Sequence, residues 1–256
     1  MVAVRREAVE RAAALLVEAW REHRTIPGIP ADVRPAAIEE AYAVQDAVSR
    51  ALGPVGGWKV GASSPTAEPR CAPLLASRVH EGPATLPAAR FHRLGIEAEL
   101  ALRIARDLPA RREPYAREEV LAAFDTLHPA IEVVDSRFAD RESMDDLSLL
   151  ADNQSNGAFV YGPAVRDWRR RDLAAQPVRL VIDGAVAVER VGGNAAGDPL
   201  RGVVWLANHL AERGQPLRAG QIVTTGTTTG LLWVSPGAVV EAEFPGVGAV
   251  QLTIGR

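Results

Sequence analysis

Two glutamates spaced two residues apart, Glu97 and Glu99, are the first residues of this sequence that could carry chemistry. Residues 96–104 alternate between two faces in a period of two, which predicts a strand. Both carboxylates then project from one face, with Cα atoms about 6.5–7 Å apart. A hard cation such as Mg²⁺ or Mn²⁺ prefers carboxylate oxygen and would relieve the repulsion between them. The alternative interpretation is a solvated polar face helped by Arg103.

A third carboxylate, Glu132, lies within an apolar segment, AIEVV, at residues 130–134. Residues 131–135 are predicted to form a strand, where an unpaired carboxylate would be costly to bury. Glu132 therefore either completes a set of three oxygen ligands with Glu97 and Glu99 or pairs with an arginine such as Arg137.

Lys59 is the only lysine among the 29 basic residues of the chain; all the others are arginines. A compositional bias toward arginine accounts for most of this ratio. Lysine nevertheless differs from arginine, because it is a compact charge that can lose its proton when buried. A position that keeps lysine is a candidate for proton transfer or anion contact, although chance retention at the surface gives the same count.

Two polar loops could contact a ligand. The loop DNQSNG, at residues 152–157, also has the ordinary composition of a turn. The loop TTGTTTG, at residues 224–230, offers hydroxyls and backbone amides that could hold a carboxylate, but it lacks the lysine and the spacing of a P-loop. The five histidines are scattered, so neither a histidine metal centre nor a Ser-His-Asp triad is favoured.

Hydrophobic periodicity predicts the elements that must position these residues. Helices are expected over residues 4–23, 35–52, 118–127 and 198–214. Strands are expected over residues 58–62, 96–104, 131–135, 158–161, 178–182, 185–191, 222–225, 239–244 and 247–254. Strands and helices do not alternate regularly, which argues against a doubly wound or TIM-type parallel sheet. We expect an α+β protein with a largely antiparallel, rolled or barrel-like core.

Composition narrows the classes of partner. The 256 residues carry a net charge of −3, which gives no basic surface for nucleic acid. A single cysteine, Cys71, excludes an intramolecular disulfide and a cysteine-rich zinc site. The first residues have no signal-peptide pattern, and no run is apolar and long enough to span a bilayer. We therefore expect a cytoplasmic protein that binds neither nucleic acid nor a membrane.

A series of motifs follows in a specific order along the chain. They are GWKVG (57–61), IEAELA (96–101), RDLP (106–109), IEVVDSR (131–137), ADNQSNG (151–157) and LRAGQIVTTG (217–226), the last preceded by the helix at 197–214. Together they resemble the 2-keto-4-pentenoate hydratase and 4-oxalocrotonate decarboxylase branch of the fumarylacetoacetate hydrolase superfamily. The resemblance runs from about residue 36 to the C-terminus.

The resemblance implies a mixed, largely antiparallel β-sandwich roll, with an N-terminal helical region (1–56) packed on a catalytic core (57–256) that acts as a single functional unit. It implies one Mg²⁺ or Mn²⁺ per subunit, held by Glu97, Glu99 and Glu132. Catalytic roles fall on Lys59 and Ser155. The residues expected to contact substrate are Asp152, Asn153, Thr225, Gly226 and Thr227.

The sequence departs from the family pattern in two places. Many members read KVGLTS where this chain reads KVGASS, at residues 59–64. Many also carry an aspartate before an aromatic residue and a glycine, in a segment that closes over the site. The corresponding stretch here, residues 73–82, has no aspartate, and Glu81 is the candidate replacement as acid–base group.

The resemblance, together with the three carboxylates and Lys59, implies a metal-dependent hydratase, a lyase that adds water to a 2-hydroxy-2,4-dienoate or 2-oxo-4-enoate in the meta-cleavage pathway of aromatic catabolism. The product is a 4-hydroxy-2-oxo acid. Decarboxylation of a 2-oxo-3-enedioate is the first alternative, because it needs the same enolate stabilisation. Acylpyruvate C–C hydrolysis and a non-catalytic accessory subunit rank lower. The resemblance also implies a homo-oligomer and association with a paired decarboxylase or hydratase.

Overall fold

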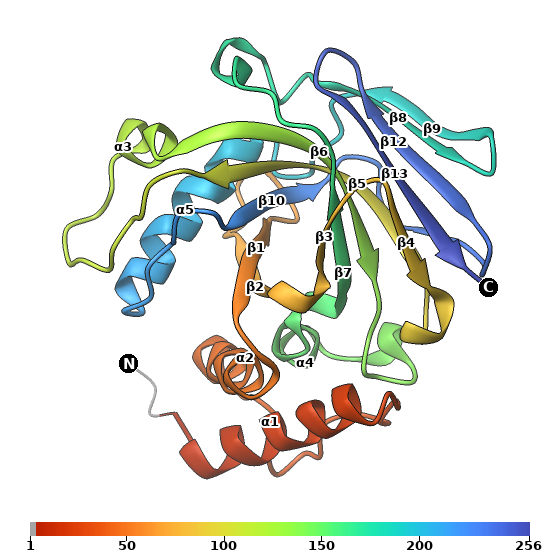
Figure 1. Ribbon diagram of the computed structural model, residues 1–256. Helices are drawn as coiled ribbons and strands as arrows, with labels where there is room; N and C mark the ends of the chain where they lie inside the picture. Colours follow the sequence, from red (N-terminus) through yellow and green to blue (C-terminus); the bar gives the residue numbers. More distant parts are fainter. Residues whose placement is uncertain (1–3) are drawn as a thin grey trace.

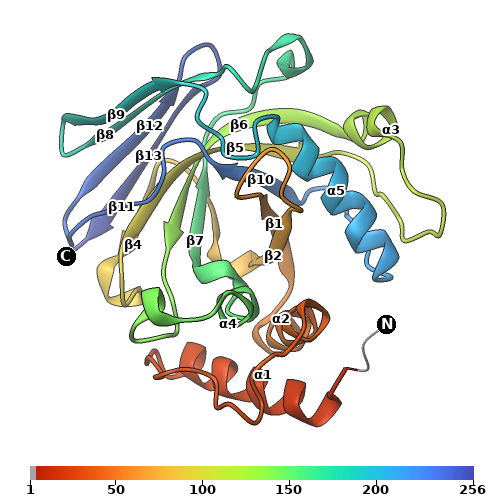
Figure 2. The same ribbon diagram turned by 180° about the vertical axis from the view of Figure 1, so that it is seen from behind.

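A computed structural model describes residues 4–256 and shows two β-sheets flanked by helices (Figures 1 and 2). The first sheet has the order β2-β1-β10-β5-β6-β7-β3, with β11 paired to β5. Its strands are β1 (Val55–Gly61), β2 (Arg70–Leu75), β3 (Val79–Glu81), β5 (Gly95–Ile104), β6 (Phe124–Val134), β7 (Asn156–Tyr161), β10 (Ile222–Thr227) and β11 (Leu232–Trp233). The second sheet, in the order β4-β13-β12-β8-β9, contains β4 (Ala84–Pro87), β8 (Pro177–Ile182), β9 (Ala185–Val191), β12 (Val239–Phe244) and β13 (Gly248–Gly255).

Most neighbouring strands in both sheets are antiparallel. The parallel pairs are β1 with β10, β3 with β7 and β4 with β13. The edge strands β2 and β3 of the first sheet do not pair with each other in the described chain, so this sheet does not close into a barrel. The predicted mixed, largely antiparallel α+β architecture is confirmed.

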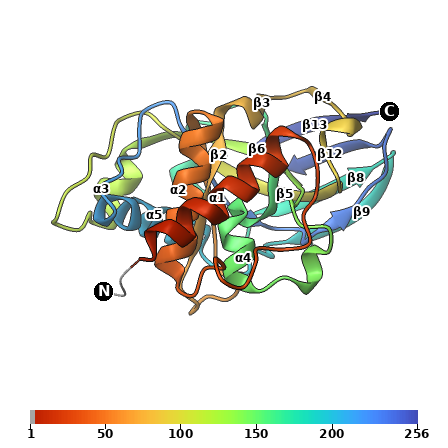
Figure 3. The same ribbon diagram turned by 90° about the horizontal axis from the view of Figure 1, so that it is seen from below.

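Two helices cover one end of the first sheet. Figures 1 and 3 show α1 (Arg6–Arg21) lying across α2 (Ile38–Leu52), and α2 packs on β2 and α4 (Asp146–Ala151). Their buried side chains join the same hydrophobic cluster as those of the central strands. The other helices are α3 (Arg117–Ala122) and α5 (Pro199–Glu212). Within residues 4–256, no helix combines the length and the apolar character that a membrane crossing requires.

The helix predicted over residues 118–127 is wrong in its second half. Helix α3 ends at Ala122, and β6 begins at Phe124. Strand β6 pairs with β5 along almost its whole length, from Phe124 opposite Ile104 to Val134 opposite Gly95. This long ladder overrides the local helical spacing of residues 124–127, because each paired residue gains two-sided burial in the sheet.

Residues 70–87 form three strands that the periodicity does not predict. Prolines in this segment argue against strands, since proline cannot donate to a ladder. Strand β2 contains Pro73 and β4 ends at Pro87, and both are edge strands, where one side of the backbone needs no partner. The edge position explains why proline is tolerated there.

Candidate active site

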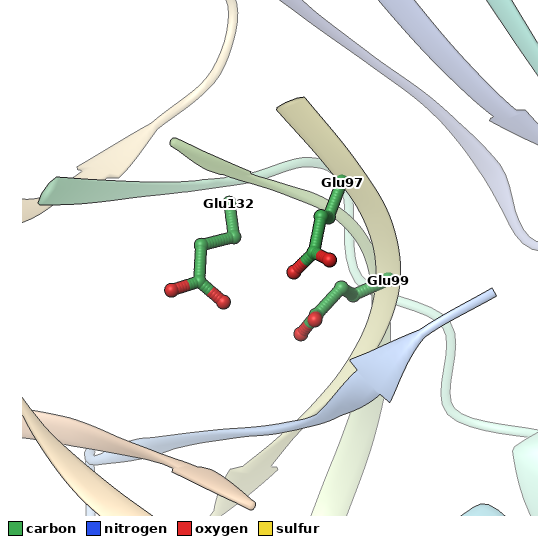
Figure 4. Close-up of side chains that lie close together, drawn as sticks. All are labelled: Glu97, Glu99 and Glu132. Carbon is green, nitrogen blue, oxygen red and sulfur yellow. The ribbon is translucent and has the colours of Figure 1, made fainter. Parts of the chain in front are cut away.

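Three carboxylates converge between two central strands of the first sheet. Glu97 and Glu99 project from β5, and Glu132 lies opposite Glu97 on the antiparallel neighbour β6. One carboxylate oxygen of each residue lies within 4.8 Å of the others. Figure 4 shows the three side chains extending into the same space. The two-residue spacing on β5 thus gives both of its glutamates the face that Glu132 shares.

Burial and mutual repulsion oppose ionisation of this carboxylate cluster. Glu99 and Glu132 are 1% and 0% exposed. Burial, and after it the charge of Glu132, raises the pKa of Glu97 to about 7. Burial, and then the charges of Glu132 and Glu97, also raises the pKa of Glu99 well above its ordinary value, although Thr224 donates a hydrogen bond to it. Three carboxylates at this spacing can be ionised together only if a strong positive charge nearby offsets their repulsion.

Lys59 on β1 supplies one positive charge to the cluster. Its Nζ donates to Glu132 Oε1 over 2.6 Å and to the carbonyl oxygen of Gln154 over 3.2 Å. Burial acts to lower the pKa of Lys59, but the charges of the three glutamates together outweigh it and raise this pKa. Lys59 therefore stays a cation. Its charge, together with that of Arg141, which also favours the ionised form of Glu97, does not balance three carboxylates.

The remaining polar atoms of the cluster fit a divalent cation. Asn156 Nδ2 donates over 2.9 Å to the same Glu132 oxygen that contacts Lys59. The other oxygen, Glu132 Oε2, is buried without a hydrogen-bond partner in the described chain. A buried carboxylate oxygen without a donor is costly. Since all three side chains offer only oxygen, the set suits Mg²⁺ or Mn²⁺.

A left-handed turn, η4 (Asn153–Ser155), forms the wall beside Lys59. Its three residues have φ values of 50°, 50° and 59°, a region that residues other than glycine rarely occupy. This conformation directs the Gln154 carbonyl at Lys59, while Ser155 Oγ accepts a hydrogen bond of 2.9 Å from Arg141 Nε. The turn therefore positions two cations at once.

Asp152 lies behind this turn. Its carboxylate accepts from Ser136 Oγ over 2.8 Å and from Arg137 Nε over 2.5 Å, and Asp152 is 1% exposed. The neighbouring Asn153 is also buried, and its Oδ1 has no hydrogen-bond partner among residues 4–256. The contacts of Asp152 fix the turn from behind, and the expected substrate contact of both residues stays a prediction.

The threonine loop contributes one glycine with a positive φ and one hydroxyl to the cavity. Thr225 turns inward, and its Oγ1 donates to the Leu100 carbonyl over 2.9 Å. Gly226, with φ of 88°, and Thr227 line a cavity beside the carboxylate cluster. Thr227 Oγ1 accepts from the Gly230 amide over 3.0 Å. Of the three residues expected to contact substrate here, Gly226 and Thr227 are thus at the cavity surface.

This cavity has a volume of about 780 Å³. Its wall includes Glu97 of the cluster, Gln154 of the left-handed turn and residues of the loop that joins β1 to β2. Sequence reasoning missed several polar residues that also line it, among them Glu68, Arg141 and Asn194. They lie outside the helices and strands that the sequence predicts, so no hydrophobic periodicity marks them. The sequence indicates them only as polar side chains near a motif that was already singled out.

Glu81 lies elsewhere. It is exposed at the end of edge strand β3, opposite Tyr161, and it is not among the residues that line the cavity. The structure does not bring Glu81 to the other predicted site residues, and its acid–base role stays a prediction without geometric support.

Comparison with known proteins agrees with the resemblance seen in the motifs. Residues 58–255 match the family described as Fumarylacetoacetate (FAA) hydrolase C-terminal. A 2-keto-4-pentenoate hydratase from Paraburkholderia xenovorans (strain LB400) is 30% identical over 94% of this chain and 93% of that protein. A 4-oxalocrotonate decarboxylase from Pseudomonas putida is 35% identical over about half of each chain (52% and 50%).

A solved structure is similar over nearly the whole chain. The 4-oxalocrotonate decarboxylase from Pseudomonas putida G7, complexed with magnesium and adipate, covers 98% of this chain and 99% of its own, with a TM-score of 0.87 and 26% identity.

Proposed function

This chain belongs to the fumarylacetoacetate hydrolase C-terminal family, and within it we propose a hydratase, a lyase that adds water to a 2-hydroxy-2,4-dienoate to give a 4-hydroxy-2-oxo acid. The observation that carries this proposal is the convergence of Glu97, Glu99 and Glu132 beside Lys59. Relatives named as hydratases of 2-keto-4-pentenoate or 2-hydroxyhexa-2,4-dienoate, which match over most of the chain, support the type of reaction.

Glu97, Glu99 and Glu132 would hold one Mg²⁺ or Mn²⁺. When bound, such an ion supplies Lewis-acid stabilisation of negative charge on the 2-oxygen of the acid. Asn156 and Lys59 orient Glu132, and Thr224 orients Glu99. The carboxylates are therefore positioned by hydrogen bonds of their own, as ligating groups in metal sites usually are.

The chemistry also requires proton transfers at both ends of the diene. Ketonisation removes a proton from the 2-hydroxyl and adds one to the far carbon; water then adds at C4, and C3 gains a proton. We assign to Lys59, a cation whose Nζ is fixed by two acceptors, delivery of the proton that C3 gains after water has added. We assign activation of water to Glu68, which lines the cavity and makes no ion pair within the described residues. Glu81 does not line this cavity.

A decarboxylase acting on a 2-oxo-3-enedioate is the second candidate. Two arginines, Arg70 and Arg141, line the cavity and could meet a distal carboxylate. The similarity of the whole chain to the Pseudomonas putida G7 decarboxylase also supports this candidate.

Oxygen-18 water tests the proposal and separates the two candidates. The purified protein is supplied with Mg²⁺ and 2-hydroxypenta-2,4-dienoate, or with 2-hydroxyhexa-2,4-dienedioate, and the products are read by NMR and mass spectrometry. We expect one labelled oxygen at C4 and loss of turnover on chelation. Release of carbon dioxide without label would instead identify a decarboxylase, and turnover that ignores the chelator would refute the metal-dependent mechanism.

The homo-oligomer and the pairing with a decarboxylase or hydratase also remain proposals, carried by the resemblance. The cytoplasmic location is a further proposal, carried by the single cysteine. Light scattering on the purified protein, alone and mixed with a partner enzyme, tests the first two.

A further inference from the structure

Gln154 combines two features that no other residue of the cavity wall shares in the described chain. It has a φ of 50° without being glycine, and its side-chain Oε1 is buried without a hydrogen-bond partner. Among residues 4–256 its side-chain amide takes part in no hydrogen bond, whereas its backbone carbonyl accepts from Lys59 Nζ over 3.2 Å. The cavity wall therefore contains one uncharged amide that has no partner in the protein.

Both features are unfavourable in the protein alone, and strained backbone conformations of this kind cluster at ligand sites. The surroundings of Gln154 hold it in place. Its neighbours Asn153 and Ser155 are 2% and 0% exposed, and Lys59 is hydrogen-bonded to its carbonyl oxygen. The side chain is thus attached to a fixed backbone, and a ligand that hydrogen-bonds to the amide would offset the cost of leaving it unpaired.

The chemistry of the amide indicates the ligand group that it suits. A glutamine side chain presents one acceptor and two donors and carries no charge. A carboxylate of the ligand has stronger partners nearby, because Arg141 also lines the cavity and Lys59 lies beside it. A hydroxyl both donates and accepts, so it can use both halves of the amide. Gln154 therefore suits an uncharged hydroxyl or a water molecule.

The contacts of Lys59 place this amide along the substrate. Lys59 Nζ donates to Glu132 of the carboxylate cluster and to the Gln154 carbonyl, so Gln154 follows Lys59 on the way out from the cluster. In the proposed reaction the 2-oxo-acid end lies at the cluster and Lys59 serves C3. The next carbon is C4, the position at which water adds.

We propose that the side-chain amide of Gln154 binds the oxygen at C4, both in the water that adds and in the hydroxyl of the 4-hydroxy-2-oxo acid that results. Gln154 is then a specificity-determining residue, because a site built to hydrogen-bond a hydroxyl discriminates against a ligand that lacks it. The inference rests on the proposed function, since it takes the 2-oxo-acid end to lie at the carboxylate cluster.

A pair of 2-oxo acids that cannot be dehydrated tests the proposal without turnover. The acid 4-hydroxy-3,3-dimethyl-2-oxobutanoate has the C4 hydroxyl but no hydrogen at C3, and 3,3-dimethyl-2-oxobutanoate differs from it only in lacking the hydroxyl. The protein with Mg²⁺ is titrated calorimetrically with each acid. We expect the hydroxylated acid to bind about 3- to 10-fold more tightly, the usual effect of one or two hydrogen bonds. Gln154→Leu, which keeps the size without the amide, should reduce this ratio to about one.

Gln251→Leu is the matched control. Gln251 is exposed on β13, opposite Glu241, and does not line the cavity, so this variant should keep the preference for the hydroxylated acid. Gln154→Gly covers the case that Gln154→Leu does not fold, because glycine adopts a positive φ without strain and also lacks the amide. Its ratio should likewise be about one.

Three results would overturn the proposal: no preference in the wild-type protein, a full preference in the Gln154 variants, or an equal loss of both acids in Gln154→Leu. The last would place Gln154 at the 2-oxo-acid end that the two ligands share. Product analysis with oxygen-18 water is read separately from binding. Water addition without a preference for the hydroxylated acid would refute only the role of Gln154, whereas a preference without water addition would refute only the hydratase.

Discussion

Two clusters of buried charge lie on opposite sides of the left-handed turn Asn153–Ser155. The rear cluster consists of Arg137 and Asp152. Arg137 donates from Nε to the Asp152 carboxylate, from Nη2 to the Asp152 carbonyl and from Nη1 to the Asn156 carbonyl. Its guanidinium also lies 4.2 Å from the ring centroid of Trp20 on α1. The front cluster consists of Lys59 and the three glutamates of the carboxylate cluster. In it, Glu132 Oε2 has no hydrogen-bond partner in the described chain.

The two clusters differ in how completely their charges are paired, which indicates that the rear cluster stabilises the fold and the front cluster binds a ligand. The rear cluster has one cation for one carboxylate, and each side-chain nitrogen of Arg137 has an acceptor. A closed pair of this kind is costly to break but offers nothing to a substrate. Burial raises carboxyl pKa values in both clusters, including that of Asp152, but in the front cluster the repulsion between carboxylates adds to it, and a divalent cation would correct this excess of negative charge. Substitutions on the two sides should therefore damage different properties.

Glu132→Gln should have the largest effect, because it removes the carboxylate that both Lys59 and the proposed metal ion share. We expect kcat/KM to fall by at least about 10³-fold and Mg²⁺ binding, measured by calorimetry, to be lost. Glu241→Gln on the exposed face of β12 is the control and should change neither. Retained Mg²⁺ binding in Glu132→Gln would remove this residue from the metal site.

Arg137→Met tests the rear cluster. Removing one partner of a buried pair leaves the charge of Asp152 uncompensated, and we expect the free energy of unfolding to fall by about 3–5 kcal/mol in urea titrations. The same substitution should leave Mg²⁺ affinity of the folded fraction nearly unchanged, because Arg137 makes no contact with the three glutamates. A large loss of affinity without loss of stability would show that the two clusters are not separate.

Lys59→Arg tests whether the single lysine is retained for chemistry. Arginine keeps the charge, but its wide fork does not match a position fixed by Glu132 Oε1 and the Gln154 carbonyl, and it cannot lose a proton. We expect turnover to fall about 10²- to 10⁴-fold, the usual contribution of a general acid–base group, with thermal stability nearly retained. Unchanged turnover in Lys59→Arg would mean that the reaction does not require lysine at this position and that its retention is accidental.

Elements that carry a local signal, either a regular spacing of apolar residues or a characteristic turn dipeptide, were predictable from the sequence. Helices α1 and α2 follow from apolar spacing, and the hairpin of β8 and β9 follows from Asp183-Gly184, whose φ values of 51° and 79° fit a tight two-residue turn. Residues 124–127 and 70–87 were not predictable, because their strands depend on partners distant in the chain and on edge positions in the sheets.

The site residues on strands were likewise predictable from the sequence, and those on loops were not. The alternation of β5 is sufficient to place Glu97 and Glu99 on one face, and apolar neighbours mark Glu132 as unusual. Glu68, Arg141 and Asn194 reach the cavity only through loop conformation, which leaves no period in the sequence. The hydrogen bond between Arg141 and Ser155 joins two loop positions, and no local pattern specifies it.

The pH dependence of stability without metal sharpens the contrast between the clusters. Because the pKa of Glu97 is about 7 in the folded protein and 4.5 ordinarily, the folded state binds a proton that the unfolded chain has lost between these values. This group therefore lowers stability as pH rises from about 5 to about 7, by up to about 1.4 kcal/mol per pH unit.

Urea titrations in chelator, compared between wild type and Glu97→Gln, isolate this contribution. The comparison is needed because burial lowers the pKa of His209 to about 4, which acts in the opposite direction over part of the same range. The wild-type protein should lose stability relative to Glu97→Gln as pH rises, and added Mg²⁺ should restore it. Parallel curves for the two proteins would show that Glu97 is not strained by its neighbours.

Glu68→Gln and Glu81→Gln give the smallest effect and decide which carboxylate serves the far end of the substrate. Glu68 lines the cavity, whereas Glu81 lies at an exposed strand edge. Since Glu68 is itself exposed, water can partly replace it, and we expect a fall in kcat of about tenfold, below the usual general acid–base contribution, together with loss of one limb of the pH profile. Glu81→Gln should stay within about twofold of wild type, as expected for a surface substitution. The reverse order would restore Glu81 to the role that its position in the sequence predicts and would require the β3 edge to approach the cavity during turnover.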